Sequence, residues 1–502
     1  MNTVLKYIVS IILLLSFISC SEDLVDTVKT GTLSGKVVKK GTNEALANVK
    51  IYTSPTTKTV FTATDGTFTI EDIPIGDYSV KAELQGYLDK YEGVNITNAN
   101  TDVTVVFEMS DDNSLNSPPT APILISPIDN ATELPTSVTL TWNATDADTK
   151  DILTYTLIVK NDYDSNVIKI ENISDKTYTL NNLKFGANYF WQIIASDGVN
   201  KAVNSNIFHF KTSSTPPNRY HYVQKSNGNF IIVSSNEDGS SKFNLTENTS
   251  NSFRPKLNND TGLIAFIRNI GGNNQIFTSK KDGTDVKQVT TIPVTGFSAT
   301  EISFSWDKTG NQIIYPNFNK LYKINKDGSG LVLLYTTPDS SIISECDWSY
   351  DGSKIALKTN NLNGYNAKIY IIDLLGNTIK TILSGINGAT GGINFSIQAD
   401  KLMYTRDITS YQDSNYRILD SHIFIYNLNT DTVIDISSLS DKPAGTNDLD
   451  PRFSPNDAEI IFVNTSNDGI SQKSIIKIPV NFNSSNNART TLFTNAEMPD
   501  WE

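Results

Sequence analysis

Cysteine is nearly absent, since the 502 residues contain two, Cys20 and Cys346. Two cysteines cannot supply the disulfide framework of small exported domains, so each domain must be held by a hydrophobic core of its own. Cys346 lies between Glu345 and Asp347 on a predicted strand, with no adjacent histidine or basic residue to lower the pKa of its thiol. We therefore expect Cys346 to be a small buried apolar residue and not a reactive thiol.

Histidine is also scarce, and its positions form no catalytic or metal-binding motif. His209, His221 and His422 share neither an H-x-x-x-H nor an H-E-x-x-H spacing. The sequence also lacks the G-x-S-x-G motif of hydrolases and a glycine-rich loop that opens a helix. The sequence therefore assigns no catalytic or cofactor-binding residue, and it predicts no cofactor apart from the calcium considered below.

Positive charge is outweighed by negative charge. The formal net charge is −13 and the isoelectric point is near 4.8. This balance argues against nucleic acid and anionic lipid head groups as partners, because both are polyanions. Aromatic and β-branched residues are frequent, and long helix-favouring stretches are missing, which predicts an all-β protein. The length exceeds one ordinary core, so several domains are expected.

The N-terminus has the layout of an export signal. Lys6 precedes an apolar run over residues 7–18 that is too short to span a bilayer, and Cys20 follows it. A small residue directly before a cysteine resembles the lipobox of bacterial lipoproteins, with Phe17 in place of the usual leucine. The resemblance implies that residues 1–20 are a lipoprotein signal peptide, that Cys20 is lipidated and that the membrane is reached through this lipid alone. The alternative is an ordinary signal peptide that is cut nearby.

Residues 21–30 are expected to form a tether, which begins with Ser21, Glu22 and Asp23. This acidic start resembles the surface-export signals of Bacteroidota lipoproteins, and it implies an outer-membrane lipoprotein exposed at the cell surface. A plain solvated tether is the alternative, because three residues are a short signal.

Residues 31–110 alternate apolar and polar residues between turn signals, which predicts short strands in a compact β-sandwich. Four segments of this stretch resemble the carboxypeptidase regulatory-like family: Ala47-Asn48-Val49, Thr64-Asp65-Gly66-Thr67-Phe68, Ile73-Pro74-Ile75-Gly76-Asp77-Tyr78 and Gly86-Tyr87. The resemblance implies a transthyretin-like fold and a non-catalytic module. Asp65, Gly66, Pro74 and Gly76 are then turn residues.

A polar, proline-containing segment over residues 111–119 predicts a stiff linker, and residues 120–213 predict a second β-sandwich. Leu183-x-Phe185-Gly186-x-x-Tyr189-Phe190-Trp191 resembles the corner between strands E and F of fibronectin type III domains. The resemblance implies that the Tyr189 hydroxyl binds the backbone across this corner and that Trp142 is a core residue.

One cluster in the second sandwich has the composition of a metal site. Asp146, Asp148 and Asp151 stand in the sequence D-A-D-T-K-D, and three carboxylates in one loop can coordinate Ca²⁺ together with backbone oxygens. Lys150 stands where many such loops have glycine, and the glycine and glutamate of an EF-hand loop are missing. A solvated turn is therefore the alternative to a calcium site.

A repeat organises the C-terminal half. Aligned copies place an apolar residue at spacings of 44 to 58 residues: Leu257, Phe304, Trp348, Phe395, Phe453 and Trp501. After each of the first five, two further apolar runs predict a second and a third strand, and turns such as Asp327-Gly328 lead into a fourth. This period suits the four-stranded blades of a propeller. In this alignment Trp306 is expected in a loop.

The last copy starts one residue before the C-terminus, so its remaining strands must come from the stretch after the second sandwich. We therefore predict a six-bladed propeller that is closed by pairing of residues 499–501 with the first propeller strands, which removes open sheet edges. Residues 219–502, with motifs such as Phe453-Ser454-Pro455-Asn456-Asp457, resemble the β-propeller repeat of the TolB family. That resemblance implies a periplasmic or extracellular binding propeller. The loop Thr409 to Leu419 is either a functional insertion or a plain elaboration.

The predicted fold class is thus all-β, with two small β-sandwiches followed by a six-bladed β-propeller closed by the C-terminal strand. The first functional hypothesis is a non-catalytic outer-membrane or surface lipoprotein whose propeller binds a protein or a polysaccharide, with the sandwiches as spacer. An alternative is a propeller glycoside hydrolase or lyase in which Asp347 meets an acid of another blade in the central channel. A further alternative is an envelope-assembly factor of TolB type.

Overall fold

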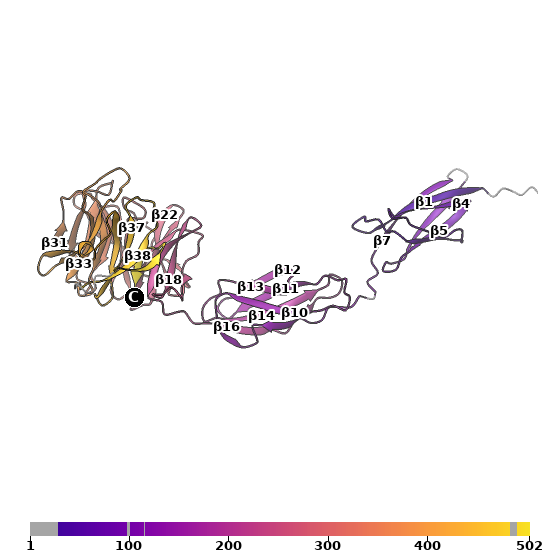
Figure 1. The fold of residues 1–502 in the computed structure, drawn as a ribbon, viewed down its shortest axis with the longest axis horizontal. Coiled ribbons are helices and arrows are strands. Elements are labelled where there is room, and N and C mark those ends of the chain that lie inside the picture. The colour runs from indigo at the N-terminus through magenta and orange to yellow at the C-terminus, as the bar shows by residue number, and fades with distance from the viewer. Residues whose placement is uncertain (1–28, 98–100, 115, 482–488) are drawn as a thin grey trace, which may run out of the picture. The chain divides into compact units, whose positions relative to one another are not determined.

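The computed structural model describes residues 29–97, 101–114, 116–481 and 489–502. The proposed signal peptide and Cys20 lie outside the described residues. The described chain is built almost wholly from strands (Figure 1), with one short helix, α2 (Ile436–Leu439), in its described part. Among the described residues, no helix has the length and apolar character needed to cross a membrane.

The first sandwich consists of a three-stranded and a four-stranded sheet. The order of the first is β4-β1-β7 and that of the second is β3-β2-β5-β6. The strands are β1 (Thr30–Lys39), β2 (Lys50–Ser54), β3 (Val60–Phe61), β4 (Thr67–Pro74), β5 (Gly76–Glu83), β6 (Lys90–Ile96) and β7 (Asp102–Met109). Alternate residues of these strands are buried, and they form one core that includes Leu33, Ile51, Phe68, Val80 and Phe107.

The second sandwich pairs a sheet of order β13-β10-β8 with one of order β12-β11-β14-β16-β9, to which β15 adds at β14. The strands are β8 (Ile123–Ser126), β9 (Ala131–Leu134), β10 (Val138–Asn143), β11 (Thr154–Asn161), β12 (Val167–Ile173), β13 (Thr177–Leu180), β14 (Asn188–Ser196), β15 (Val203–Asn204) and β16 (Phe208–Thr212). Trp142 of β10 is buried, as predicted, and its ring meets that of Tyr155 of β11 edge-on at 5.6 Å. The two sheets therefore share one core.

The rest of the chain forms six antiparallel four-stranded sheets. Blade 1 contains β17 (Tyr220–Ser226), β18 (Asn229–Ser235), β19 (Phe243–Asn244) and β40 (Glu497–Trp501). Blade 2 contains β20 (Ser252–Asn258), β21 (Leu263–Ile270), β22 (Asn273–Lys280) and β23 (Lys287–Gln288). Blade 3 contains β24 (Ser305–Trp306), β25 (Gln312–Asn317), β26 (Lys320–Asn325) and β27 (Val332–Thr336).

The remaining blades follow the same order. Blade 4 contains β28 (Ile342–Trp348), β29 (Ile355–Asn360), β30 (Lys368–Ile372) and β31 (Thr378–Leu383). Blade 5 contains β32 (Thr390–Phe395), β33 (Lys401–Asp407), β34 (Ser421–Asn427) and β35 (Thr432–Asp435). Blade 6 contains β36 (Thr446–Phe453), β37 (Glu459–Ser466), β38 (Ser474–Pro479) and β39 (Thr490–Thr494).

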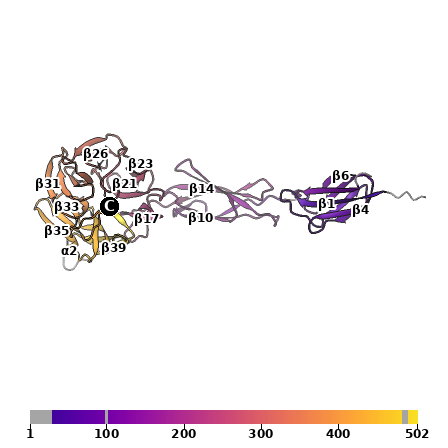
Figure 2. The same ribbon diagram turned by 90° about the horizontal axis from the view of Figure 1, so that it is seen from above.

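The C-terminal strand closes the ring, as predicted. β40 pairs with β17, with Trp501 opposite Tyr220 and Asp500 opposite His221. The innermost strands contact one another in the order β40, β20, β24, β28, β32 and β36, and β36 returns to β40. Figure 2 views this ring close to its axis. Because the last strand of the chain completes the first blade, the propeller has no open edge at the junction of its ends.

The repeat alignment was wrong in blade 3. In the other blades that begin with their innermost strand, the repeated residue pairs with the residue seven positions later, as Leu257 does with Ile264 and Trp348 with Ile355. In blade 3 the residue in this position is Trp306, which pairs with Ile313. Phe304 lies two residues earlier and so on the same face of the extended chain, which is why the apolar pattern did not separate the two. Trp306 is therefore a buried strand residue and not a loop residue.

Candidate functional site

A ring of hydrogen bonds joins neighbouring blades at one end of the central channel. We call the six residues Leu257, Trp306, Trp348, Phe395, Phe453 and Trp501 the anchors. At four junctions, the residue before one anchor accepts a hydrogen bond from the backbone N–H of the next anchor. These pairs are Asp500 with Leu257 (2.7 Å), Ser305 with Trp348 (3.0 Å), Asp347 with Phe395 (2.8 Å) and Asn394 with Phe453 (2.9 Å).

The other two junctions use indole donors instead. Trp306 Nε1 donates to the carbonyl oxygen of Lys256 at 3.0 Å, and Trp501 Nε1 donates to that of Phe453 at 2.7 Å. At these junctions the residue before the anchor is Lys256 or Arg452, and a cation cannot accept a hydrogen bond from an N–H group. Each of the six junctions therefore has its own bond, and the side chain before each anchor lines the channel.

A cavity of about 220 Å³, which we call the anchor pocket, opens at this end of the channel. The charged lining residues on the innermost strands, which we call the floor, are two cations, Lys256 and Arg452, and two acids, Asp347 and Asp500. Lys256 is 8% exposed and Arg452 is 6% exposed, and Lys256 Nζ lies 3.6 Å from Asp347 Oδ1. Arg452 donates through Nη1 to two backbone carbonyls, and within the described residues its Nε and Nη2 have no protein acceptor.

Burial shifts the ionisation of this floor. It raises the pKa of Asp500 to about 6, although the bond from the Leu257 N–H and the charges of Arg452 and Lys256 oppose the shift. Burial also lowers the pKa of Lys256, mostly because the charged amine loses water, and Arg452 lowers it further.

The wall of the anchor pocket contains aromatic side chains, of which those of blade 4 are the most exposed. Trp348 is partly buried and donates through its indole to the carbonyl oxygen of Gly352 at 3.3 Å. Tyr350 is 41% exposed, and Lys308 Nζ lies 4.7 Å from the centre of its ring. The other aromatic anchors also line the pocket but are only 6–8% exposed: Trp306, Phe395, Phe453 and Trp501. Blade 4 therefore supplies the aromatic surface that is open to a ligand.

A second cavity, of about 110 Å³, lies at the other end of the channel. Arg254 and Asp450 form an ion pair there, and Arg254 Nη2 donates to the carbonyl oxygen of Thr300 at 2.9 Å. Both residues have left-handed backbones, with φ of 54° and 47°. The same position in blades 5 and 1, at Gly392 and Met498, is also left-handed.

Each of these four positions lies at a β-bulge in the innermost strand. A bulge turns the side chains on its two sides in different directions. Residues at the bulge, such as Arg254 and Asp450, line the smaller cavity, whereas Lys256 and Arg452, two positions later, line the anchor pocket. The two cavities have no lining residue in common.

The loop Thr409 to Leu419 borders the smaller cavity. Tyr416 lines it, donates through its hydroxyl to the carbonyl oxygen of Thr390 at 3.1 Å, and packs on Phe297 at 4.7 Å. Beneath it Lys358 is fully buried, its amine is 4.8 Å from the ring of Phe297, and burial lowers its pKa. Tyr416 has a φ of 55°, a strained conformation that these contacts hold in place.

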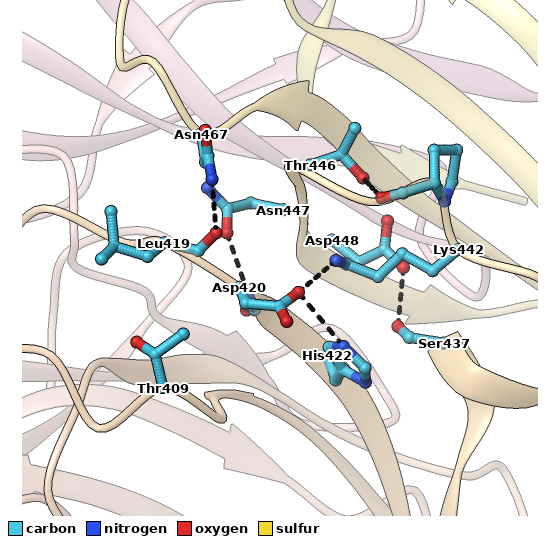
Figure 3. A network of polar contacts seen from close by, with 12 residues as sticks. Thr409, Leu419, Asp420, His422, Ser437, Lys442, Thr446, Asn447, Asp448 and Asn467 are labelled. Atoms are coloured by element: carbon cyan, nitrogen blue, oxygen red, sulfur yellow. Dashed lines mark hydrogen bonds and ion pairs between the residues drawn. The ribbon is translucent and has the colours of Figure 1, made fainter.

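A polar network fixes this loop to blade 6 (Figure 3). Asn467 donates to the carbonyl oxygen of Leu419 at 2.9 Å, and Asn447 donates to that of Ile418 at 2.9 Å. At the base of the loop, the buried Asp407 carboxylate accepts from the backbone N–H groups of Thr409 and Leu419. The loop is therefore an ordered part of the propeller.

His422 and Lys442 both contact Asp420 in the same network (Figure 3). The second ring nitrogen of His422, Nδ1, lies 2.9 Å from the carboxylate of Asp435. Asp435 also caps the helix α2 by accepting from the Ser438 N–H. Both ring nitrogens of His422 contact a carboxylate, so neither is free to bind a metal or a substrate.

The three aspartates of the second sandwich do converge. One carboxylate oxygen each of Asp146, Asp148 and Asp151 lies within 4.8 Å of the others. Asp148 accepts from the Ser117 N–H at 2.7 Å, and Asp146 accepts from the Asp148 N–H at 2.9 Å. The Oδ2 atoms of Asp146 and Asp151 are buried and have no hydrogen-bond partner among the described residues. Unpaired carboxylate oxygens at this separation could coordinate a calcium ion placed between them.

The other residues singled out in the sequence are placed as follows. Cys346 is fully buried, as predicted, and burial raises the pKa of its thiol well above the usual range. Asp347 shares the anchor pocket with an acid of another blade, Asp500. Sequence reasoning missed Lys256 and Arg452, although both stand directly before an anchor and could have been found from that position.

The closed ring of six sheets defines a β-propeller protein with β-sandwich domains before the propeller in the sequence. Residues 33–117 match the family of CarboxypepD_reg-like domains, which confirms the predicted resemblance of this segment. None of the curated proteins matches the chain.

Several solved structures are similar to the chain. For TolB from Acinetobacter baumannii the identity is 14% and the TM-score is 0.44, with 63% of this chain and 79% of that chain covered. For a putative TolB from Agrobacterium tumefaciens the values are 15% and 0.40, with 56% and 90% covered. For an oligogalacturonate lyase in complex with manganese they are 10% and 0.34, with 56% and 73% covered. Similarities at this level assign no function to the chain.

Proposed function

We propose that the chain is a non-catalytic lipoprotein of the outer membrane or cell surface, whose propeller binds a protein or a polysaccharide. The observation that supports the proposal is that carboxylates in the channel accept hydrogen bonds from neighbouring blades. Asp347 accepts from the Phe395 N–H, the Asn394 amide and the Ser305 hydroxyl. Glu345 accepts from the backbone N–H groups of Gly392 and Ile393 at 3.1 Å. These carboxylates join blades.

A glycosidase needs two carboxyl groups that are free to meet the scissile bond and its attacking water. A carboxylate whose oxygens already accept several protein donors is poorly placed to meet a substrate and its attacking water. The ordered aromatic and polar lining of the anchor pocket remains available for binding. Binding without turnover is therefore the function that we favour.

One observation keeps a second candidate, a propeller glycoside hydrolase or lyase. Asp347 and Asp500 come from blades 4 and 1, on opposite sides of the ring, and line the same pocket. Burial raises the pKa of Asp500 to about 6, the range of a general acid. Product formation from a polysaccharide that is lost in Asp500→Asn would establish this alternative.

The proposed cellular location depends on residues outside the described part of the chain. We propose that Cys20 carries the lipid, that Ser21, Glu22 and Asp23 direct the protein to the surface in the manner of Bacteroidota lipoproteins, and that the two sandwiches act as spacer. The division of the second sandwich into a three-stranded and a longer sheet supports its proposed likeness to fibronectin type III domains.

Two experiments test the proposal. Membrane fractionation should find the chain with the outer membrane and should find Cys20→Ala in the soluble fraction; a Cys20→Ala protein that stays in the membrane would contradict the lipid anchor. Crosslinking on intact cells, together with a glycan array, should recover a ligand in unchanged form. A wild-type chain that retains neither a protein nor a glycan would contradict the binding function.

A further inference from the structure

We infer that the anchor pocket receives the uncharged terminal sugar residue of a glycan, inserted end-on. This inference rests on the proposed binding function, and it specifies which end of the channel binds and what chemistry it recognises. Four features carry it: the charge balance of the floor, the spare donors on that floor, the size of the cavity and its aromatic wall.

The charge balance selects against a charged end group. On the floor, Lys256 and Arg452 are matched by Asp347 and Asp500, so these four groups carry no net charge when all are ionised. Lys308, Asp260 and Asp307 line the rest of the pocket. A carboxylate, phosphate or ammonium group placed there would bring an uncompensated charge into a site where charges are poorly solvated. A purely apolar group would leave the remaining donors of Lys256 and Arg452 without water or a further partner. An uncharged group with many hydroxyls meets both conditions.

The floor also offers the donors and acceptors that hydroxyl groups need. Nε and Nη2 of Arg452 have no protein acceptor in the described chain, and Lys256 has one ion-pair partner for its three N–H donors. The carboxylate of Asp500 accepts through Oδ2 from Leu257. Each sugar hydroxyl can donate to an acid and accept from a cation at once, and hydrogen bonds to charged groups are among the stronger ones.

The size of the pocket selects an end group over the middle of a chain. Its volume of about 220 Å³ lies below the roughly 300–1,000 Å³ of sites for drug-sized ligands. The anchor pocket and the cavity at the other end of the channel share no lining residue. A ligand that enters the anchor pocket through its mouth presents one terminal unit to the floor.

The aromatic wall fits the apolar face of a sugar ring. The exposed part of Trp348 and the 41% exposed Tyr350 lie on blade 4 at the pocket. The face of an aromatic ring carries negative charge density and attracts the weakly positive C–H groups of a pyranose. Asn259, Asp260 and Asp307 also line the pocket and are polar partners for hydroxyl groups.

The test uses the full-length chain in a detergent without a sugar head group. Binding is measured by calorimetry to oligosaccharides that differ in the terminal unit: a neutral hexose, a hexuronate or a hexose whose terminal ring has been opened by periodate. We expect the neutral end group to bind and the other two to bind at least about tenfold more weakly, the equivalent of 1.4 kcal/mol.

Two variants and one control address the pocket. Tyr350→Ala should weaken binding of the neutral glycan about tenfold, because one aromatic face is lost. Asp500→Asn keeps an acceptor for the Leu257 N–H but gives the floor a net positive charge, so it should shift the preference toward the hexuronate. Leu375→Ala, on an 86% exposed residue of the same blade, should bind as the wild type does.

A wild type that prefers the hexuronate, or binds none of the neutral-capped glycans, overturns the inference. It is also overturned if Tyr350→Ala and Asp500→Asn, with unchanged thermal unfolding, bind as the wild type. If the chain still captures a cell-surface ligand in these cases, only the inference about the terminal sugar is contradicted. If the chain captures nothing on intact cells or arrays, the proposed binding function is contradicted as well.

Discussion

Removing the Asp347 carboxylate should strongly destabilise the propeller while sparing the two sandwiches. Asp347 is 6% exposed, accepts the Phe395 N–H at 2.8 Å and lies 3.6 Å from the buried amine of Lys256. Asp347→Ala leaves this amine without an ion-pair partner and the N–H without an acceptor. Breaking a buried ion pair costs about 3–5 kcal/mol. We add no separate cost for the unpaired N–H, because the contributions of neighbouring groups are not additive.

Asp347→Asn should cost less, about 1–3 kcal/mol, because its amide oxygen can still accept the hydrogen bond from Phe395. Asp351→Ala is the matched control, since Asp351 lies in the exposed turn of the same blade and binds Ser349 and Ser353 there. Its effect should stay within about 1 kcal/mol.

The assay must separate the propeller from the sandwiches. Trp142 and Trp191 lie in the second sandwich, so whole-chain fluorescence mixes the two regions. Hydrogen–deuterium exchange of propeller peptides in increasing urea follows the propeller alone. With an m-value of about 3 kcal/mol/M, Asp347→Ala should lower the midpoint by about 1–2 M. A shift equal to that of Asp351→Ala would refute the view that the ring of inter-blade bonds stabilises the propeller.

Three further predictions concern other parts of the chain. Burial raises the pKa of Asp500 to about 6 in the folded state, against about 3.9 in the unfolded chain, so the folded state binds more protons between these pH values. The free energy of unfolding should therefore fall by up to about 3 kcal/mol as the pH rises from 4 to 7. The urea midpoint of Asp500→Asn should lack this fall, and an equal pH dependence in wild type and variant would contradict the prediction. Trp306→Phe should lower propeller stability by about 1–2 kcal/mol in the same exchange assay, because the indole bond to Lys256 is lost; no loss would show that this junction does not depend on the bond. Added Ca²⁺ should slow exchange around Asp146 in the wild type but not in Asp146→Asn; unchanged exchange at millimolar Ca²⁺ would exclude a calcium site there.

The sequence was sufficient for the propeller because a repeat reports strand order directly. The repeat around Trp501 supplies a single strand, so its partner strands were predicted at the start of the propeller. The pairing of β40 with β17 confirms this prediction. The register of blade 3 could not be determined in the same way, because Phe304 and Trp306 are two residues apart and both are apolar and buried. Hydrogen-bond pairing with Ile313 separated them.

The candidate site was much less predictable. Asp347 could be named as a channel residue, but its role as an inter-blade acceptor depends on the Phe395 N–H of the next blade, 48 residues later. Lys256 and Arg452 can be placed at the channel from their position directly before an anchor, but only the folded ring shows that they share one floor. The β-bulges of the innermost strands arise at residues such as Arg254 and Asp450, where a left-handed backbone is not expected.

The central claim is that the acids of the channel hold the blades together, so that the propeller binds its ligand without cleaving it. The most direct test is the mass of a neutral-capped polysaccharide recovered after long incubation with the full-length chain between pH 5 and 8. We predict an unchanged mass at every pH, with or without Asp500→Asn. Shortened products that form with the wild type and disappear in Asp500→Asn would contradict the claim.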